Sequence, residues 1–372
     1  MLNASHSRKW DAEKEQIEYV DIETPILPKS CLNWFGGCKN LLEISNQQNL
    51  CVDECTNMTS MFAGCEKLVK IDSSKWNTSN VTLMNYMFQN CRKLTKLDVS
   101  NFNTSKVLSM GNMFRSVQNV KNLDVSNFDT SKVTNMSGMF WGMDSLLELD
   151  LNNFNTSKVT HMGLMFSTMS SLTELDISSF DTSKVTNMTR MFSFVPQVTK
   201  LDLSNFDTSK VTSMAQMFWK MEALIDLDIS SFDTSEVTNM GGMFSEVRNL
   251  ETLDVSHFDT SNVTDMTSMF HRMNSLKKID LSNFDTSKVT NMAQMFYEMD
   301  NLTELDISNF DTSQVTRMES MFFYAKSLET LDLSHFDTSN VTNMYAMFMG
   351  CKKLTSLDIS NFNTSQVTNM SD

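Results

Sequence analysis

Residues 123–140 read Leu-Asp-Val-Ser-Asn-Phe-Asp-Thr-Ser-Lys-Val-Thr-Asn-Met-Ser-Gly-Met-Phe. Near copies of this block recur every 26 residues, for example from Leu97 to Leu123. A short variable stretch follows each copy. The blocks begin at Leu97, Leu123, Leu149, Leu175, Leu201, Leu227, Leu253, Ile279, Leu305, Leu331 and Leu357. A fixed period in this range indicates a solenoid, in which each repeat is one supersecondary unit stacked on its neighbours.

The start of each repeat has the pattern of a β-strand. Leu146, Leu149 and Leu151 follow Leu-x-x-Leu-x-Leu, which is the strand half of a leucine-rich repeat. Alternation along the strand sends Leu149 and Leu151 into the core and Asp150 outward. The polar residues 155–157 then predict a turn, because short polar side chains bond nearby backbone amides.

The second half of the repeat has helical spacing. Apolar residues stand at offsets of 3, 6, 7 and 10 from Val159, at Met162, Met165, Phe166 and Met169. This spacing suits one face of a helix and predicts a short helix over residues 163–169. The sequence therefore predicts an α/β leucine-rich-repeat solenoid of about 13 coils, with parallel strands on one face and short helices opposite.

Three segments follow from the repeat pattern. We expect residues 1–15 to be poorly ordered, residues 16–45 to form an irregular capping coil, and residues 46–372 to form the solenoid. The last repeat stops after Met370-Ser-Asp, where earlier repeats continue to Met-Phe. Since terminal coils normally carry a polar cap, we expect the chain to be a fragment of a longer protein.

Composition excludes several classes of partner. The formal net charge of −15 disfavours nucleic acid and anionic membranes. No stretch approaches the ~18 apolar residues of a membrane span, so direct membrane insertion of this chain is not expected. We also expect a monomer, since the repeat builds one elongated core from neighbouring coils.

The seven cysteines are unevenly placed. Four occupy one repeat column that elsewhere holds Met or Val, namely Cys38, Cys65, Cys91 and Cys351, and such a column predicts buried apolar slots. The others are Cys31, Cys51 and Cys55, in the N-terminal region. A single bridge is expected there, with the pairing among Cys31, Cys38, Cys51 and Cys55 left open. No Cys-x-x-Cys pair suggests zinc.

The sequence contains no recognisable catalytic motif. A nucleophile and its base need unique, asymmetrically placed residues, whereas the reactive side chains here stand in repeated columns. The five His are scattered and no Gly-rich phosphate loop is present. We therefore expect no catalytic residue, no metal ligand and no cofactor.

Two sets of residues are candidates for ligand contact. One is the aromatic set that follows Met-Phe in every third repeat: Trp141, Trp219 and Tyr297. The other is drawn from the outward carboxylate column: Asp176, Asp202 and Asp228. Carboxylates one coil apart repel, and hydrogen bonds to backbone and Ser, or bound calcium, are the two candidate remedies. The Thr columns at Thr130 and Thr134 raise a further alternative, an ice-matching surface.

The block Phe-Asp-Thr-Ser-x-Val-Thr-Asn-Met-x-x-Met-Phe resembles the BspA-like leucine-rich-repeat proteins. More narrowly, it is similar to the 26-residue repeat of bacterial surface proteins in lactobacilli, listeriae and mycoplasma lipoproteins. The resemblance covers about residues 16–372. It implies a cell-surface or secreted location, a host or cell-surface protein or glycan as partner, and adhesion as the usual role.

Together these observations favour a non-catalytic, surface-exposed scaffold for adhesion or ligand binding. A passive spacer that presents other domains is the alternative hypothesis. An ice-binding or calcium-stabilised solenoid is a lesser one.

Overall fold

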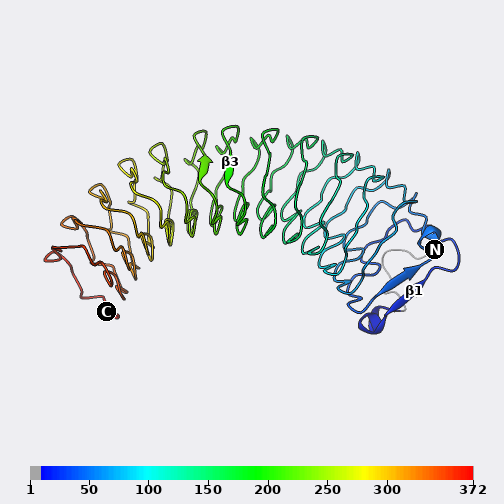
Figure 1. Ribbon diagram of the computed structural model, residues 1–372, viewed down its shortest axis with the longest axis horizontal. Coiled ribbons are helices and arrows are strands. Elements are labelled where there is room, and N and C mark those ends of the chain that lie inside the picture. The colour runs from blue at the N-terminus through cyan, green and yellow to red at the C-terminus, as the bar shows by residue number, and fades with distance from the viewer. Residues whose placement is uncertain (1–9, 372) are drawn as a thin grey trace. The chain divides into compact units, whose positions relative to one another are not determined.

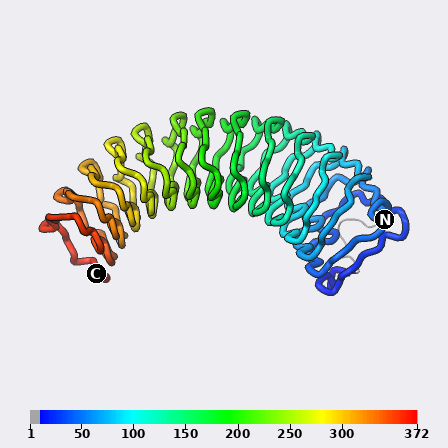
Figure 2. The backbone as a smooth tube through the Cα atoms, viewed as in Figure 1, coloured from blue at the N-terminus to red at the C-terminus, as the bar shows by residue number. Residues whose placement is uncertain are grey.

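A computed structural model describes residues 10–371 of the chain. The chain divides into two compact units, residues 1–184 (unit 1) and residues 185–372 (unit 2), where the sequence predicted one continuous solenoid. Within each unit, coils follow one another in chain order (Figure 1 and Figure 2). The repeat solenoid is thus present in each unit.

Regular secondary structure in unit 1 lies at its beginning. The 3-10 helix η1 (Asp11–Gln16) precedes strand β1 (Tyr19–Asp21), and the 3-10 helix η2 (Gln47–Asn49) follows strand β2 (Glu43–Ser45). β1 and β2 pair in parallel, with Val20 opposite Ile44. Most of η1 falls in the segment expected to be poorly ordered, and residues 1–9 of that segment lie outside the described residues.

Unit 2 contains the strands β3 (Lys200–Asp202) and β4 (Asp226–Asp228). They pair in parallel, with Leu201 opposite Leu227, one repeat apart. Isolated bridges elsewhere in both units are also parallel, for example Ser109 with Asn135. The pairing of successive repeats is parallel, as predicted, but within residues 97–371 the predicted strand layer forms strands only at β3 and β4.

The second half of each repeat forms a ladder of turns, not a helix. In the coil around Phe140, the amide of Met139 donates to Met136 O at 3.1 Å and that of Met143 to Phe140 O at 3.2 Å. Alternate amides bond to the following coil instead: Phe140 N–H donates to Met165 O at 3.1 Å and Gly142 N–H to Ser167 O at 2.9 Å, while Trp141 N–H donates to Gly138 O in its own coil. We call this segment, residues 136–143 and its equivalents, the turn ladder.

The helix predicted over residues 163–169 is therefore wrong. An α-helix needs every amide to bond within its own turn, whereas here every second amide bonds to the next coil. Leu164 and Thr168 have φ angles of 62° and 58°, which no right-handed helix contains. A positive φ at the third residue of a turn is typical of type II turns.

A stack of phenylalanine rings runs through the core of each unit. In unit 1, the ring centroids of Phe88, Phe114 and Phe140 are 6.0 and 5.9 Å apart, with interplanar angles of 7° and 12°. In unit 2, Phe218 lies 5.9 Å from Phe192 and 5.5 Å from Phe244. Each of these rings is fully buried.

Two threonine columns have opposite environments. Thr130 is buried, and its hydroxyl donates to Asn155 O at 3.0 Å while accepting from Asn155 N–H at 2.8 Å. Thr134 is exposed, and its hydroxyl donates to Leu108 O at 3.2 Å. Because only one column reaches the surface, the two-column ice-matching array is not formed.

Candidate binding surface

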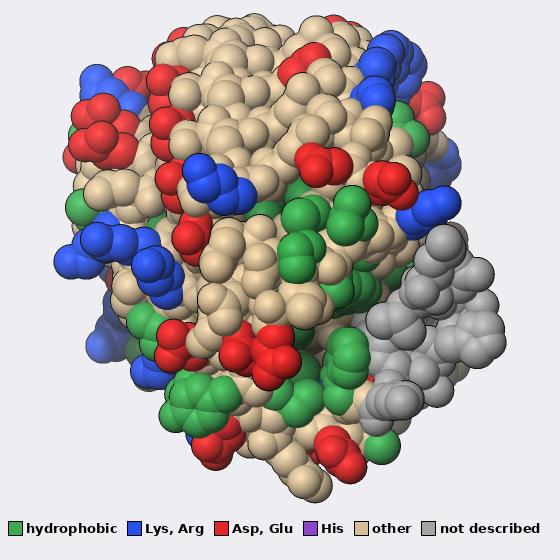
Figure 3. Space-filling model, turned by 90° about the vertical axis from the view of Figure 1, so that its right-hand side faces the viewer, with side chains coloured by type: hydrophobic (Ala, Val, Ile, Leu, Met, Phe, Trp, Pro, Cys, Tyr) green, Lys and Arg blue, Asp and Glu red, His purple; other side chains and the backbone are tan. Residues whose placement is uncertain are grey.

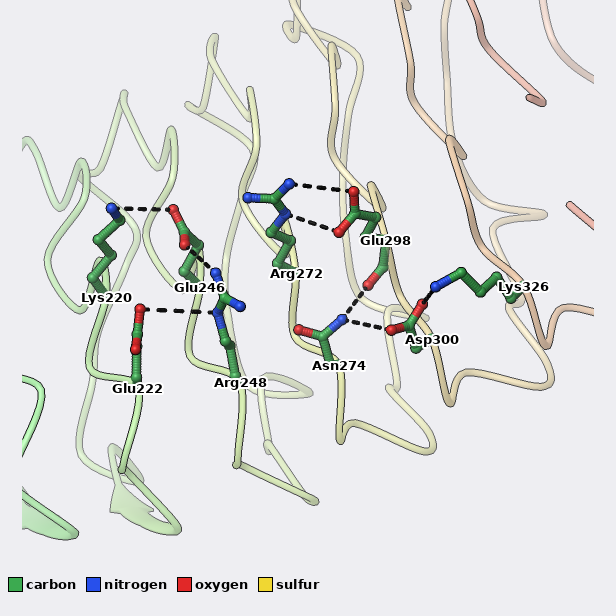
Figure 4. Close-up of polar contacts among 9 residues, drawn as sticks. All are labelled: Lys220, Glu222, Glu246, Arg248, Arg272, Asn274, Glu298, Asp300 and Lys326. Carbon is green, nitrogen blue, oxygen red and sulfur yellow. Dashed lines mark hydrogen bonds and ion pairs between the residues drawn. The ribbon is translucent and has the colours of Figure 1, made fainter. Parts of the chain in front are cut away.

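The positions that follow Met-Phe in unit 2 lie on one side of the turn ladder and depart from the repeat. We call this surface the turn face of unit 2. It contains the polar residues that Figure 4 labels, namely Lys220, Glu222, Glu246, Arg248, Arg272, Asn274, Glu298, Asp300 and Lys326. It also contains the neighbouring rings of Trp219, His271, Tyr297, Phe323 and Tyr324.

Stacked rings form the apolar part of the turn face. The ring of Tyr297 lies 4.5 Å from His271 and 4.6 Å from Phe323, with interplanar angles of 12° and 8°. Tyr324 adds a tilted ring 4.7 Å from Phe323. Burial and, secondarily, the charge of Arg272 lower the pKa of His271 to about 4, so this imidazole is neutral at pH 7. Both faces of the Tyr297 ring are covered, and a ligand can reach only its edge and hydroxyl.

Figure 4 shows ion pairs between successive coils, and the guanidinium carbon of Arg272 lies 5.6 Å from the ring centroid of Tyr297. Arg272 binds Glu298 through two contacts, Nε to Oε2 at 2.9 Å and Nη2 to Oε1 at 3.3 Å. Lys326 Nζ lies 2.9 Å from Asp300 Oδ1. Bidentate Arg–carboxylate geometry holds both side chains in place.

A second group of ion pairs centres on Glu246. Arg248 Nη2 lies 2.6 Å from Glu246 Oε2, Lys220 Nζ lies 3.8 Å from Glu246 Oε1, and Arg248 Nε lies 3.9 Å from Glu222. Burial alone would raise the pKa of Glu246, yet the Arg248 hydrogen bond and the charge of Lys220 lower it below its ordinary value. The turn face thus neutralises its own charges.

The other two predicted aromatic contacts are also half-buried. In unit 1, the Arg115 guanidinium carbon lies 3.6 Å from the ring centroid of Trp141 and covers it. In unit 2, Trp219 lies 6.4 Å from the ring of Phe194, and Lys220 Nζ lies 5.1 Å from its centroid. Each ring therefore packs against side chains of its own or a neighbouring coil.

The predicted carboxylates are exposed but engaged in turns. Oδ1 of Asp176, Asp202 and Asp228 accepts the backbone N–H two residues ahead, at 3.0, 2.9 and 3.0 Å. Ser230 also donates its hydroxyl to Asp228 at 2.6 Å. The hydrogen-bond remedy for the carboxylate column is thus present. Among residues 10–371, no group of three or more His, Cys, Asp or Glu could hold a metal ion.

These hydrogen bonds make stability depend on pH. Bonds from Ser100, Ser126 and Ser204 lower the pKa values of Asp98, Asp124 and Asp202 below the ordinary 3.8. The unfolded chain then binds more protons than the folded one near that pH, so stability is full above it and falls on acidification. We expect the thermal midpoint to decrease steadily below about pH 4.

Differential scanning calorimetry between pH 7 and pH 2 measures this decrease. Ser126→Ala removes the largest cause of the Asp124 shift and should make the acid slope shallower. A midpoint that stays constant down to pH 2 would contradict the role assigned to the carboxylate column.

A cavity of about 1030 Å³ lies at the N-terminal coil of unit 1. Its apolar lining includes Ile17, Val20, Ile22, Trp34 and Phe35. Figure 3 looks onto this end of the molecule and shows hydrophobic side chains gathered among acidic ones. The sequence did not predict a cavity here.

The turn face has a pattern in the sequence that is visible only when residues one repeat apart are compared. Read one repeat apart, Lys220, Glu246, Arg272 and Glu298 alternate in sign, which predicts ion pairs between neighbouring coils. Phe323 and His271 flank Tyr297 at the same interval. Tyr297 was therefore predicted as a contact residue without its two neighbours.

Comparison with known proteins supplies one family match. The model described as "Mycoplasma protein of unknown function, DUF285" matches residues 29–124, 109–198, 194–302 and 270–372. No curated protein matches the chain. In the described part of the chain, no helix is long and apolar enough to cross a membrane.

Several solved structures are similar to the chain. A leucine-rich repeat protein from Eubacterium ventriosum has 16% identity and a TM-score of 0.47, with 94% of this chain and 87% of that chain covered. One from Bacteroides ovatus has 15% identity and a TM-score of 0.48, with coverage of 95% and 82%. The functional domain of InlJ from Listeria monocytogenes has 19% identity and a TM-score of 0.30, with coverage of 84% and 54%.

Proposed function

The chain belongs to the family described as "Mycoplasma protein of unknown function, DUF285", and on that premise we propose that it is a non-catalytic scaffold that binds a partner protein through the turn face of unit 2. The proposal rests on one observation: side chains that depart from the repeat pattern are concentrated on this face. Elsewhere in the repeat, the same residue types recur because the fold needs them.

The geometry of the turn face favours a protein partner. Stacked rings and paired charges are already ordered, so little side-chain entropy is lost on binding. An apolar centre of aromatic side chains with a polar, charge-paired rim is the usual anatomy of a protein interface. A glycan stacks on an open ring face, whereas both faces of Tyr297 are covered by His271 and Phe323.

We divide the residues that the sequence predicted as ligand contacts into three groups. Tyr297 and Trp219 belong to the proposed contact surface. Trp141 lies in unit 1 beneath Arg115 and is a separate, weaker candidate. Asp176, Asp202 and Asp228 hold turns, and we assign them a structural role, with contact to a ligand as a secondary one.

We further propose, from the family resemblance, that the protein works at the cell surface as an adhesin. Its partner would then be a host or cell-surface protein. The competing function is a passive spacer, which predicts no partner for the chain.

Binding assays with paired variants distinguish these functions. Immobilised extracellular-matrix and cell-surface proteins, with a glycan array alongside, would be probed with the full chain. Tyr297→Ala with Phe323→Ala should weaken binding to a protein by roughly tenfold or more, because aromatic anchors dominate interface energies. Thr264→Ala with Thr290→Ala, in the exposed Thr column of the same unit, should leave binding unchanged.

Thermal unfolding of both double variants controls for loss of fold. Equal binding by the aromatic double variant would refute the contact surface. If no protein bound at about 100 μM, a concentration that detects binding free energies stronger than about −5.5 kcal/mol, the spacer would be favoured.

A further inference from the structure

Two cysteine-bearing segments of unit 1 run side by side. The amide of Thr56 donates to Lys29 O at 3.1 Å, and the amide of Cys31 donates to Asn57 O at 2.8 Å. These two bonds place residues 29–31 along residues 55–57. Neighbouring extended segments joined in this way lie about 4.8 Å apart.

Both cysteine side chains point into the same interior. Cys31 and Cys55 are each 0% exposed. Each thiol shifts the pKa of the other, and Cys55 Sγ donates to Asn57 O at 3.4 Å. The carbonyl that accepts the Cys31 amide thus also accepts the Cys55 thiol. Two cysteines on the same side of adjacent segments have the arrangement that a disulfide can bridge.

We propose that Cys31 and Cys55 are a disulfide site that joins the N-terminal coil to the coil after it. Both are free thiols in this structure. The oxidant is a small-molecule disulfide, encountered before the N-terminal coil has packed. The site does not depend on the function proposed for unit 2.

The exchange proceeds in two balanced steps. Before the N-terminal coil packs, both thiols are accessible to the small disulfide, and we take Cys55 as the one that loses its proton first. Its thiolate attacks the small disulfide, forms a mixed disulfide and releases one small thiol. The Cys31 sulfur then loses its proton, attacks the Cys55 sulfur and releases the second small thiol. Two protein thiols are oxidised, and one small disulfide is reduced to two thiols.

The column cysteines provide an internal contrast. Cys65 Sγ donates to Phe35 O at 3.2 Å, and Cys91 Sγ donates to Phe62 O at 3.1 Å. Each of these thiols is directed at a backbone carbonyl of the preceding coil. Desolvation by burial also raises the pKa values of both thiols, which keeps them protonated and unreactive.

Alkylation and mass spectrometry test the assignment. The full chain would be refolded from guanidinium with oxidised glutathione, denatured again without reductant, and treated with iodoacetamide. Of the seven cysteines, two in a disulfide leave five to be labelled. Peptide mapping should recover one cross-linked peptide that contains Cys31 and Cys55. Labelling of all seven, or a bridge from Cys55 to Cys51 or Cys38, would overturn the assignment.

Two cysteine variants serve as controls for the position of the cross-link. Cys31→Ser should give no cross-linked peptide and leave Cys55 either labelled or as a mixed disulfide with glutathione, whereas Cys65→Ser should retain the Cys31–Cys55 cross-link. Limited proteolysis supplies an independent measurement on the wild-type chain. Cleavage within residues 17–41 should be roughly tenfold slower after oxidation than with dithiothreitol, because the cross-link restricts opening of the end coil. Equal cleavage rates would count against a Cys31–Cys55 bridge.

Discussion

Phe218→Ala is expected to lower the free energy of unfolding of unit 2 by about 3–5 kcal/mol. The ring is fully buried and lies between Phe192 and Phe244, at 5.9 and 5.5 Å. Its removal takes away the apolar transfer energy and leaves a cavity, because neighbours held by backbone bonds to adjacent coils cannot close the gap. It also interrupts two stacked contacts at once.

Urea unfolding followed by circular dichroism measures this loss. Ile225→Ala is the matched control, since Ile225 is 58% exposed in the same unit. That substitution should change stability by no more than about 0.5 kcal/mol. A Phe218→Ala effect below about 1 kcal/mol would mean that the ring stack contributes little to the core.

Thr130→Val is expected to destabilise unit 1 by roughly 2–4 kcal/mol, although the two side chains have nearly the same shape. The buried Thr130 hydroxyl serves both the amide and the carbonyl of Asn155, at 2.8 and 3.0 Å. Valine would leave both of these part-buried backbone groups without their Thr130 partner, and each group orphaned away from water costs about 1–3 kcal/mol.

Thr134→Val in the same coil separates this effect from a general cost of losing Thr. The Thr134 hydroxyl is exposed, and its own amide still donates to Leu108 O at 2.9 Å without it. The control should therefore stay within about 0.5 kcal/mol of the wild type. Equal effects of the two substitutions in urea unfolding would show that the reciprocal bond at Thr130 has no special weight.

The repeat architecture and the direction of strand pairing were predictable from the sequence. A constant period allows only neighbour-to-neighbour stacking, and alternation along Leu149-Asp-Leu151 sets which side chains are buried. Leu149 and Leu151 are 8% and 1% exposed, and Asp150 is exposed, as expected.

The turn ladder could not be distinguished from a helix by periodicity. Offsets of 3, 6, 7 and 10 from Val159 bury the same side chains in either conformation. What separates the two is the destination of alternate amides, which depends on the next coil. Leu at position 164, with its φ of 62°, contains no local signal for a left-handed residue.

The candidate surface was predictable only in part. The sequence singled out Tyr297 because large aromatic residues recur at its position in every third repeat. Its environment depends on His271 and Phe323, whose significance appears only when residues one repeat apart are compared. Likewise, the Cys31–Cys55 contact depends on the irregular N-terminal coil, where the period no longer specifies which residues are neighbours.

The alternate donation of amides to the following coil has an evolutionary consequence. Recombination that adds or removes whole multiples of the repeat leaves every donor opposite an equivalent acceptor, so the gene can lengthen or shorten without redesign of any coil. An insertion of one residue inside Met136–Met143 would instead shift each later amide onto the wrong neighbour. Two sets of positions are then under different selection. Residues that keep the coils in register stay constant, whereas residues after Met-Phe can change by point substitution and give new binding specificities.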